Sequence, residues 1–191
     1  MKKIILASSS PRRKELLNQL GLKFEVAKSN FEEDMSLNMK PKSLARFLSR
    51  KKAEDVATKY DDAIIIAADT FISLGDEILG KPHTKERAKK MLRKISGKTL
   101  DVITGFTVMD TKSNKKISKS IITKVFIRNL NNSEIKSYVA TKEPLDKAGA
   151  FGIQEKGVLL IKKIEGSYTN VVGLPLTELV YVLKSFKITI L

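Results

Sequence analysis

The sequence contains no cysteine, no tryptophan and a single histidine, His83. The absence of cysteine excludes disulfides, thiolate metal sites and cysteine nucleophiles, and it fits a cytoplasmic protein. One histidine excludes multi-histidine metal sites, so a Ser-His-Asp triad would have to use His83 as its base. Because His83 follows Pro82 directly before an expected helix, a solvent-facing turn residue is the favoured interpretation.

Long apolar stretches are also missing. No run of about 18 apolar residues occurs, so no membrane span is predicted. The apolar run at 4–7 is too short for a signal peptide. The chain has 191 residues, of which 42% are hydrophobic, enough for a real core. No repeat or long Pro/Gly linker divides it, and residues 1–191 are therefore expected to form a single domain.

Positive charge is in excess, with 36 Lys and Arg against 21 Asp and Glu and a net charge of +15. Such a balance is typical of proteins that bind nucleic acid, an anionic membrane or an anionic small molecule. The lysines are widely spread and few aromatics lie among them, which gives weak support for a base-stacking platform. A basic nucleic-acid-binding module stays the alternative function, and a salt-sensitive gel shift without nucleotide turnover would favour it.

The hydrophobic pattern alternates between strand and helix periodicities, as in α/β proteins. Strands are expected at 3–7, 24–27, 63–68, 100–109, 117–127, 158–164 and 187–190. Helices are expected at 11–20, 41–59, 84–95, 132–140 (capped by Asn132 or Ser133) and 175–183.

The first candidate site is the turn between the first strand and the first helix. Ser8 and Ser10 precede Pro11, which suits the first helical position, and Ser10 can cap the free amides. Arg12 and Arg13 then place positive charge in the first helical turn, which the helix dipole disfavours. Hydroxyls, amides and guanidiniums together would form a polyphosphate cradle. An ordinary capped helix with surface arginines is an equally good interpretation of the same residues.

The second candidate site is Asp69, which follows six apolar residues at the expected carboxyl end of a buried strand. Ligands gather at such strand ends in α/β sheets. Gly75 and Asp76 favour a two-residue hairpin turn. The resulting register would pair Thr70 with Lys81 and bring Lys81 beside Asp69, either around a phosphate and a metal or as a plain salt bridge. The G-x-x-x-x-G-K pattern at 75–81 lacks the following Ser or Thr and a helix, so a P-loop is rejected.

Three further parts of the sequence contain residues that could bind a ligand. Lys52 falls on the apolar stripe of its helix, where a lysine either snorkels or meets a buried anion. The acidic cluster at 32–34 is either a solvated loop or a source of metal-binding carboxylates. The segment 144–154 is rich in small residues that allow close backbone approach, and Gln154 could supply a donor and an acceptor to a base edge.

Taken together, ten short motifs resemble those of the Maf-like nucleotide pyrophosphatases. They follow one another in order over nearly the whole chain, at 6–13, 68–70, 79–82, 96–98, 102–105, 142–144, 146–150, 152–154, 166–168 and 171–175. The resemblance implies an elongated α/β fold with a mixed sheet and flanking helices, as in inosine triphosphate pyrophosphatases. It also implies hydrolysis of a nucleoside triphosphate to the monophosphate and pyrophosphate with a divalent cation, Mg²⁺ or Mn²⁺.

The resemblance also assigns roles to individual residues. Asp69 matches the catalytic aspartate and is a metal ligand together with Glu33. Substrate binding falls to Ser8, Ser10, Arg12, Arg13, Lys52, Thr70, Lys81 and Gln154. Among these, Arg12, Thr70 and Gln154 match positions that set base preference, and the combination is similar to the branch that acts on dTTP and UTP. The nucleoside triphosphate is the expected partner; no membrane or stable nucleic-acid partner is expected, and a homodimer is allowed.

One departure and two alternatives accompany this interpretation. Family members usually follow the glutamine at position 154 with glycine, whereas here Glu155 and Lys156 precede Gly157, which puts the shape of the base pocket in doubt. The branch that acts on 7-methyl-GTP is the alternative specificity, but it carries a tryptophan near Arg12 and this chain has none. A nucleotide-binding regulator without catalysis is the other alternative, and the presence of Asp69 argues against it.

Overall fold

A seven-stranded sheet organises the computed structural model, which describes residues 2–32, 34, 37 and 39–190. The strands are β1 (Lys3–Leu6), β2 (Glu25–Val26), β3 (Ala63–Leu74), β4 (Glu77–Leu79), β5 (Thr99–Asp110), β6 (Lys116–Ile127) and β7 (Ile161–Glu165). Their order is β2-β1-β3-β5-β6-β7, and β4 pairs with β3. The sheet is mixed, because β1 runs parallel to β2 and β3 whereas β3–β4 and β6–β7 are antiparallel.

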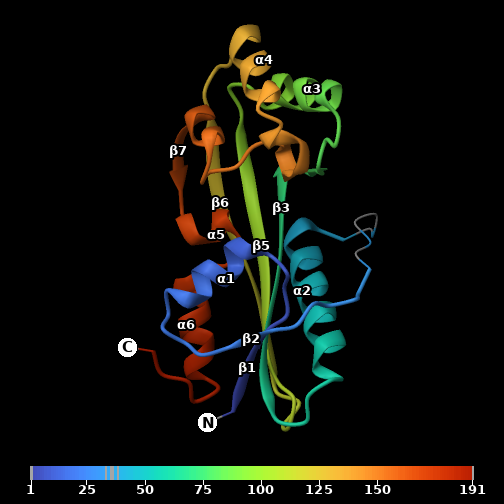
Figure 1. Cartoon of the computed structure of the whole chain (residues 1–191), viewed down its shortest axis with the longest axis vertical. Helices are drawn as coiled ribbons and strands as arrows, with labels where there is room; N and C mark the ends of the chain where they lie inside the picture. The colour runs from blue at the N-terminus through green and yellow to red at the C-terminus, as the bar shows by residue number, and fades with distance from the viewer. Residues whose placement is uncertain (1, 33, 35–36, 38, 191) are drawn as a thin grey trace. The chain divides into compact units, whose positions relative to one another are not determined.

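Helices complete the predicted α/β class, which is confirmed (Figure 1). The α-helices are α1 (Pro11–Asn18), α2 (Pro41–Ala57), α3 (Lys85–Ile95), α4 (Asn132–Ala140), α5 (Tyr168–Val172) and α6 (Leu176–Lys184). Three 3₁₀ turns, η1 (Glu143–Asp146), η2 (Ala148–Ala150) and η3 (Lys156–Leu160), were not predicted.

The chain divides into two compact units, and β3, β5 and β6 contribute residues to both. Unit 1 comprises Met1–Thr70, Thr104–Ile121 and Gly173–Leu191, and unit 2 comprises Phe71–Ile103 and Ile122–Val172. The single-domain interpretation stays a prediction.

In unit 1, helix α2 covers one side of the strands, while α1 and α6 lie on the other (Figure 1). Apolar side chains of β1, β3 and α2, including Ile5, Ile65 and Val56, form a buried cluster. Gly105 on β5 lets α2 pack directly on the sheet, because a Cβ there would lie 2.0 Å from the backbone oxygen of Ala45. The close approach explains why a glycine stands in the middle of a buried strand.

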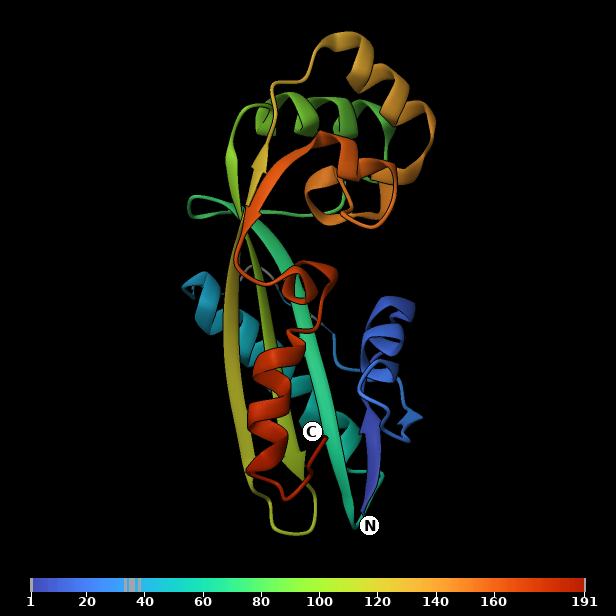
Figure 2. The same ribbon diagram turned by 90° about the vertical axis from the view of Figure 1, so that its left-hand side faces the viewer.

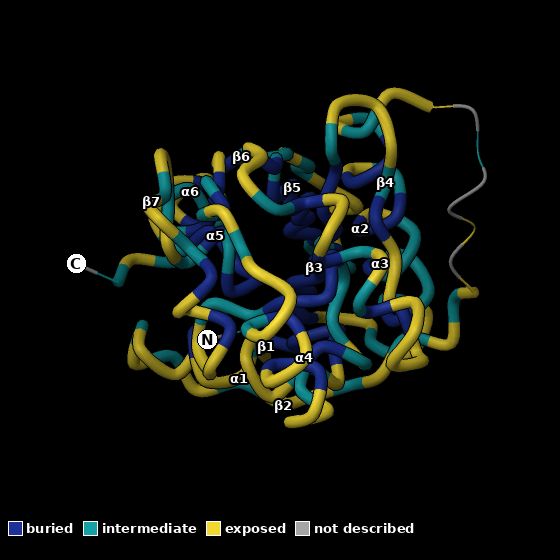
Figure 3. The backbone as a smooth tube through the Cα atoms, turned by 90° about the horizontal axis from the view of Figure 1, so that it is seen from above, coloured by how far each residue is buried: buried dark blue, intermediate teal, exposed yellow. Residues whose placement is uncertain are grey.

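Unit 2 has its own apolar core between its strands, α3, α4 and the 3₁₀ turns. Helix α3 packs against α4 (Figure 2). Thr84 caps α3 by accepting a hydrogen bond from the Arg87 amide, and Asn131 forms a capping box with Glu134 at the start of α4. The cap of α4 is therefore Asn131, rather than the predicted Asn132 or Ser133. Buried residues run along β1, β3 and β5, and many residues in the connections are exposed (Figure 3).

Two predicted strands differ from the structure. The apolar run expected as a strand at 158–164 begins as η3, and strand β7 starts only at Ile161. Residues 187–190 form no strand, because the amides of residues 185–188 donate hydrogen bonds back to the last turn of α6. In both places an apolar run of four to seven residues fits either a strand or a packed turn, and tertiary contacts decide between them.

Candidate active site

The strand order reverses beside β1, and the candidate phosphate-binding turn lies at that point. The chain runs from β1 to β2 on one side and returns through α2 to β3 on the other side of β1. In such sheets ligands bind beyond the carboxyl ends of the two strands that flank the reversal. Leu6, the last residue of β1, pairs with Ile66. The turn at 7–10 therefore follows β1 next to the part of β3 that carries Asp69 and Thr70.

Ser10 and Pro11 begin α1 as predicted. Ser10 is the N-cap residue, and its Oγ accepts a hydrogen bond of 3.5 Å from the Arg13 amide, while Pro11 occupies the first helical turn. Ser8 is buried, and its Oγ accepts a hydrogen bond of 3.2 Å from the Ser10 amide. No acidic residue stands in the first turn of α1. The positive end of the helix dipole and the two arginines thus act together on whatever lies at this turn.

Arg13 joins three separate parts of unit 1. Its Nε donates to the carbonyl oxygen of Gly173 at 2.9 Å, one terminal nitrogen donates to Ser8 Oγ at 3.3 Å, and the other donates to Thr70 Oγ1 at 3.1 Å. Thr70 Oγ1 also lies 3.0 Å from Thr104 Oγ1, which is buried. Arg12, in contrast, is exposed. Arg13 therefore fixes the geometry of the turn, and Arg12 stands on its outer side.

Asp69 and Lys52 form a buried ion pair in unit 1. The Lys52 Nζ lies 2.5 Å from Asp69 Oδ1, and the two side chains are 12% and 8% exposed. Lys52 thus meets a buried anion from the apolar stripe of α2, rather than snorkelling to solvent. The position of Asp69 differs from the prediction, because β3 continues to Leu74 and Asp69 lies within the strand rather than after its end.

The hairpin after Asp69 has the predicted turn but ends earlier than expected. Leu74 pairs with Glu77 and Ile72 pairs with Leu79, as predicted. Strand β4 ends at Leu79, so the expected pairing of Thr70 with Lys81 does not form. The expectation that Lys81 lies beside Asp69 rested on that pairing. Lys81 instead donates a hydrogen bond of 2.8 Å to Asp146 within unit 2, and this ammonium lowers the pKa of the Asp146 carboxyl.

Gln154 is an exposed residue of unit 2, two residues before the start of η3. The residue that replaces the family's usual glycine, Glu155, has φ −121°, which is extended backbone open to any residue type. Its carboxylate lies 3.0 Å from the Lys147 Nζ. The change from glycine to Glu155 therefore introduces no backbone strain after Gln154.

Of the two predicted metal ligands, only Asp69 is among the residues that the structure describes. Glu33 lies outside the described residues. Within the part of the chain that the structure describes, no group of three or more His, Cys, Asp or Glu side chains is arranged to hold a metal ion. Mg²⁺ commonly takes only one or two protein carboxylates and fills its remaining positions with substrate phosphates and water. A single buried carboxylate such as Asp69 is compatible with that kind of site.

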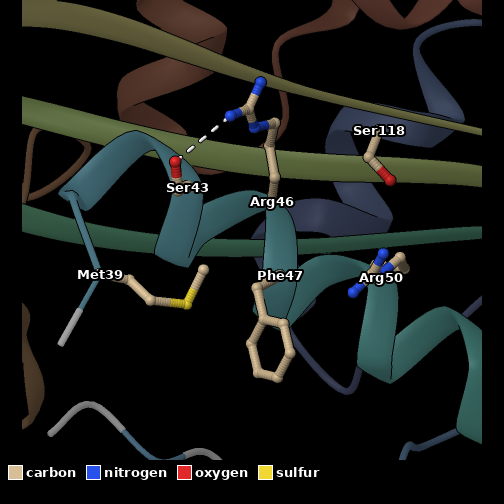
Figure 4. A pocket seen from close by; sticks show the side chains of 6 residues that line it. All are labelled: Met39, Ser43, Arg46, Phe47, Arg50 and Ser118. Atoms are coloured by element: carbon tan, nitrogen blue, oxygen red, sulfur yellow. Dashed lines mark hydrogen bonds between the residues drawn. The ribbon is translucent and has the colours of Figure 1, made fainter. Parts of the chain in front are cut away.

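A pocket of about 350 Å³ on unit 1 lies away from this site. Its lining is shown in Figure 4 and consists of Met39, Ser43, Arg46, Phe47, Arg50 and Ser118. Nine residues, or about two and a half helical turns, separate Ser43 from Lys52. The pocket therefore lies on the side of α2 opposite to the Asp69–Lys52 pair.

Two groups at the site were missed when roles were assigned from the sequence. Thr104 and the carbonyl of Gly173 both contact the Arg13–Thr70 pair. Each belongs to a motif of the family resemblance, at 102–105 and 171–175, but nothing in the sequence alone placed either beside Arg13. The one available signal was a threonine within a largely apolar stretch of β5, and Thr107 in the same stretch gives the same signal.

The site described above agrees with a match over almost the whole length of the chain. The family model described as "Maf-like protein" matches residues 3–186. The chain belongs to the Maf-like family. Curated relatives of this Maf-like protein include a dTTP/UTP pyrophosphatase from Methanococcoides burtonii, 49% identical over 100% of this chain and 98% of the relative. Another, from Alkaliphilus oremlandii and of the same name, is 48% identical over 97% of this chain and 96% of the relative.

A solved structure supports the fold of this Maf-like protein. The Staphylococcus aureus Ham1 protein aligns with a TM-score of 0.56 at 13% sequence identity, over 97% of this chain and all of that chain. At that identity the likeness shows the fold alone. In the described residues, no helix combines the length and apolar character needed to cross a bilayer.

Proposed function

We propose that this Maf-like protein hydrolyses dTTP and UTP to the nucleoside monophosphate and pyrophosphate. The observation that carries the proposal is the full-length similarity, at 44–49% identity, to relatives named dTTP/UTP pyrophosphatase. The buried Asp69–Lys52 pair and the Arg13-centred turn supply the chemistry that the reaction needs. The proposed compartment is the cytoplasm, in keeping with the cysteine-free sequence.

In the proposed reaction, water attacks the α-phosphorus and forms a new P–O bond. The bond from this phosphorus to the α,β-bridging oxygen breaks, and pyrophosphate leaves with that oxygen and the electron pair. Cationic groups stabilise the charge on the triphosphate, which is the main catalytic task in such transfers. We assign this role to Arg12, Arg13, Lys52 and Lys81, with Ser8, Ser10 and the first amides of α1 as hydrogen-bond donors. Asp69 either accepts a proton from the attacking water or binds the cation.

A divalent cation, Mg²⁺ or Mn²⁺, is proposed as the cofactor. Asp69 offers a carboxylate oxygen, the ligand type that Mg²⁺ prefers, and Glu33 is proposed as a second ligand. When bound, the cation would neutralise phosphate charge and lower the pKa of a bound water. Lys52 pairs with the Asp69 carboxylate and would orient it toward the cation.

Base choice is assigned to Gln154, Arg12 and Thr70. An amide can match the donor and acceptor edge of uracil or thymine. A site built to hydrogen-bond its ligand rejects other bases strongly, because its own polar groups would otherwise be left unpaired. The kcat/KM values for UTP and dTTP should therefore exceed those for ATP and GTP.

A turnover screen with Mg²⁺ tests this assignment in the unmodified protein and in Gln154→Ala. The variant should lose part of the preference for UTP, by about 1–3 kcal/mol if a buried partner is left unsatisfied. Gln19→Ala, at the exposed end of α1, is the matched control and should keep the preference. Equal turnover of purine and pyrimidine triphosphates by the unmodified protein would show that the base assignment is wrong.

A further inference from the structure

Gln154 stands on a short segment that is held at both ends. Gly152 lies two residues before it, and Lys156 and Gly157 lie two and three residues after it. The Gln154 side chain itself is exposed. An exposed glutamine on an unsupported segment would sample many positions, and the entropy of ordering it would weaken any base contact. The hydrogen bonds of the segment therefore decide how well Gln154 can discriminate between bases.

The Glu143 carboxylate holds the downstream end. Its Oε1 accepts a hydrogen bond of 3.0 Å from the Gly157 amide, and its Oε2 accepts one of 3.1 Å from the Lys156 amide. Hydrogen bonds from backbone amides to an ionised carboxylate are stronger than those between neutral groups. Glu143 thereby fixes the first residues of η3, which follow Gln154 and Glu155 directly.

Tyr138 connects the same carboxylate to the upstream end. Its hydroxyl donates to Glu143 Oε1 at 2.8 Å. The Gly152 backbone lies close to the same point, because a Cβ on Gly157 would lie 2.6 Å from the Tyr138 hydroxyl and 2.7 Å from the Gly152 nitrogen. The side chain is only 6% exposed, and its ring belongs to the core of unit 2. Burial, together with the hydrogen bond to the Glu143 carboxylate, raises the pKa of Tyr138. The phenol therefore stays protonated at physiological pH and keeps donating to Glu143.

The two glycines of this segment are tightly packed. A Cβ on Gly157 would lie 2.6 Å from the Tyr138 hydroxyl and 2.5 Å from the Gly152 carbonyl oxygen. The two ends of the segment are thus in contact with each other and with the phenol. The side chain of Lys147 covers Gly152 and pairs with Glu155 at 3.0 Å. The loop bearing Gln154 is consequently closed at its base.

We propose that Tyr138 and Glu143 are positioning residues that set base selectivity by holding the Gln154 segment. Neither residue needs to touch the nucleotide. This inference rests on the proposed function, because it assumes that Gln154 reads the base. It assigns selectivity to a buried phenol and a half-buried carboxylate outside the set of substrate-binding residues.

Two single variants test the proposal. Tyr138→Phe removes only the hydroxyl and keeps the ring in the core, and Glu143→Gln keeps an acceptor for Gly157 but presents an amide donor to Lys156. Each should reduce the ratio of kcat/KM for UTP over GTP by about tenfold, the size expected for loss of one charge-assisted hydrogen bond. The loss should appear mainly in the KM for UTP. Tyr181→Phe, on the exposed face of α6, is the control and should leave the ratio unchanged.

The combination with Gln154→Ala separates positioning from general damage. If Tyr138 acts through Gln154, Tyr138→Phe has no further effect on the selectivity ratio once Gln154 is alanine. Independent, multiplicative losses in the double variant would overturn the proposal.

Amide hydrogen exchange gives a readout that does not depend on the reaction. The Lys156 and Gly157 amides should exchange about tenfold faster in Tyr138→Phe than in the unmodified protein. Unchanged exchange at these amides would overturn the proposal that Tyr138 and Glu143 hold the Gln154 segment, even if the protein prefers UTP. An unmodified protein without a preference for UTP would instead contradict the proposed function. The exchange result would still report whether Tyr138 and Glu143 hold the segment.

Discussion

Replacing Asp69 with asparagine is expected to lower kcat for UTP by at least about 10²–10⁴-fold, the range for loss of a general base. Asp69 is a buried carboxylate with one short contact to Lys52. Asparagine has the same shape and keeps an oxygen to accept from Lys52, but it can neither take a proton nor neutralise a cation. The expected loss therefore holds for either role of Asp69, water activation or cation binding.

The control for Asp69→Asn is Asp61→Asn, an exposed aspartate before the same strand. It should leave kcat unchanged, and circular dichroism should show both variants folded. An Asp69→Asn variant with normal kinetics would refute both proposed roles of the carboxylate.

Replacing Arg13 with lysine is expected to lower kcat/KM by about 10²-fold, the cost of misplacing a site by an ångström or so. The guanidinium donates in three directions, to Gly173, Ser8 and Thr70. A lysine ammonium is a compact charge on a flexible stem and cannot reproduce this planar arrangement. The positive charge is kept, so the loss would measure geometry rather than charge.

Arg46→Lys, on the exposed side of α2, is the matched control for Arg13→Lys and should behave as the unmodified protein. Steady-state kinetics with UTP and a thermal unfolding curve on each variant separate lost activity from lost stability. Normal kcat/KM in Arg13→Lys would mean that the bridge between the turn, Thr70 and Gly173 has no role in catalysis.

Local features of the site could be predicted because they depend on residues close in sequence. Ser10 and Pro11 start α1 through capping and a fixed φ, and Gly75 with Asp76 sets the register of the β3–β4 hairpin. The oddity of Lys52 on an apolar stripe was also visible. The partner of Lys52 could not be predicted, because the apolar stripe of α2 does not show which strand the helix packs against. Lys81 was expected beside Asp69 instead, on the basis of a strand pairing between Thr70 and Lys81 that does not form because β4 ends at Leu79.

Contacts between distant segments could not be predicted. Arg13 and Gly173 are 160 residues apart, and Thr70 and Thr104 are 34 apart. Their meeting depends on the sheet order, which a sequence pattern does not specify. The same limit applies to Glu143, whose carboxylate accepts hydrogen bonds from amides 13 and 14 residues further along the chain. An irregular segment with 3₁₀ turns lies between them. The strand predicted at 187–190 and the start of the one predicted at 158–164 were wrong for a related reason, because packing decides whether such short segments become strands.

The proposed reaction requires water to attack the α-phosphorus of UTP and release pyrophosphate. Hydrolysis in ¹⁸O-labelled water, with product identification by mass spectrometry, is the decisive measurement. We expect UMP and pyrophosphate as the only products, with the label in UMP. Label in pyrophosphate would place the attack on the β-phosphorus, and release of UDP with orthophosphate would contradict the assignment altogether.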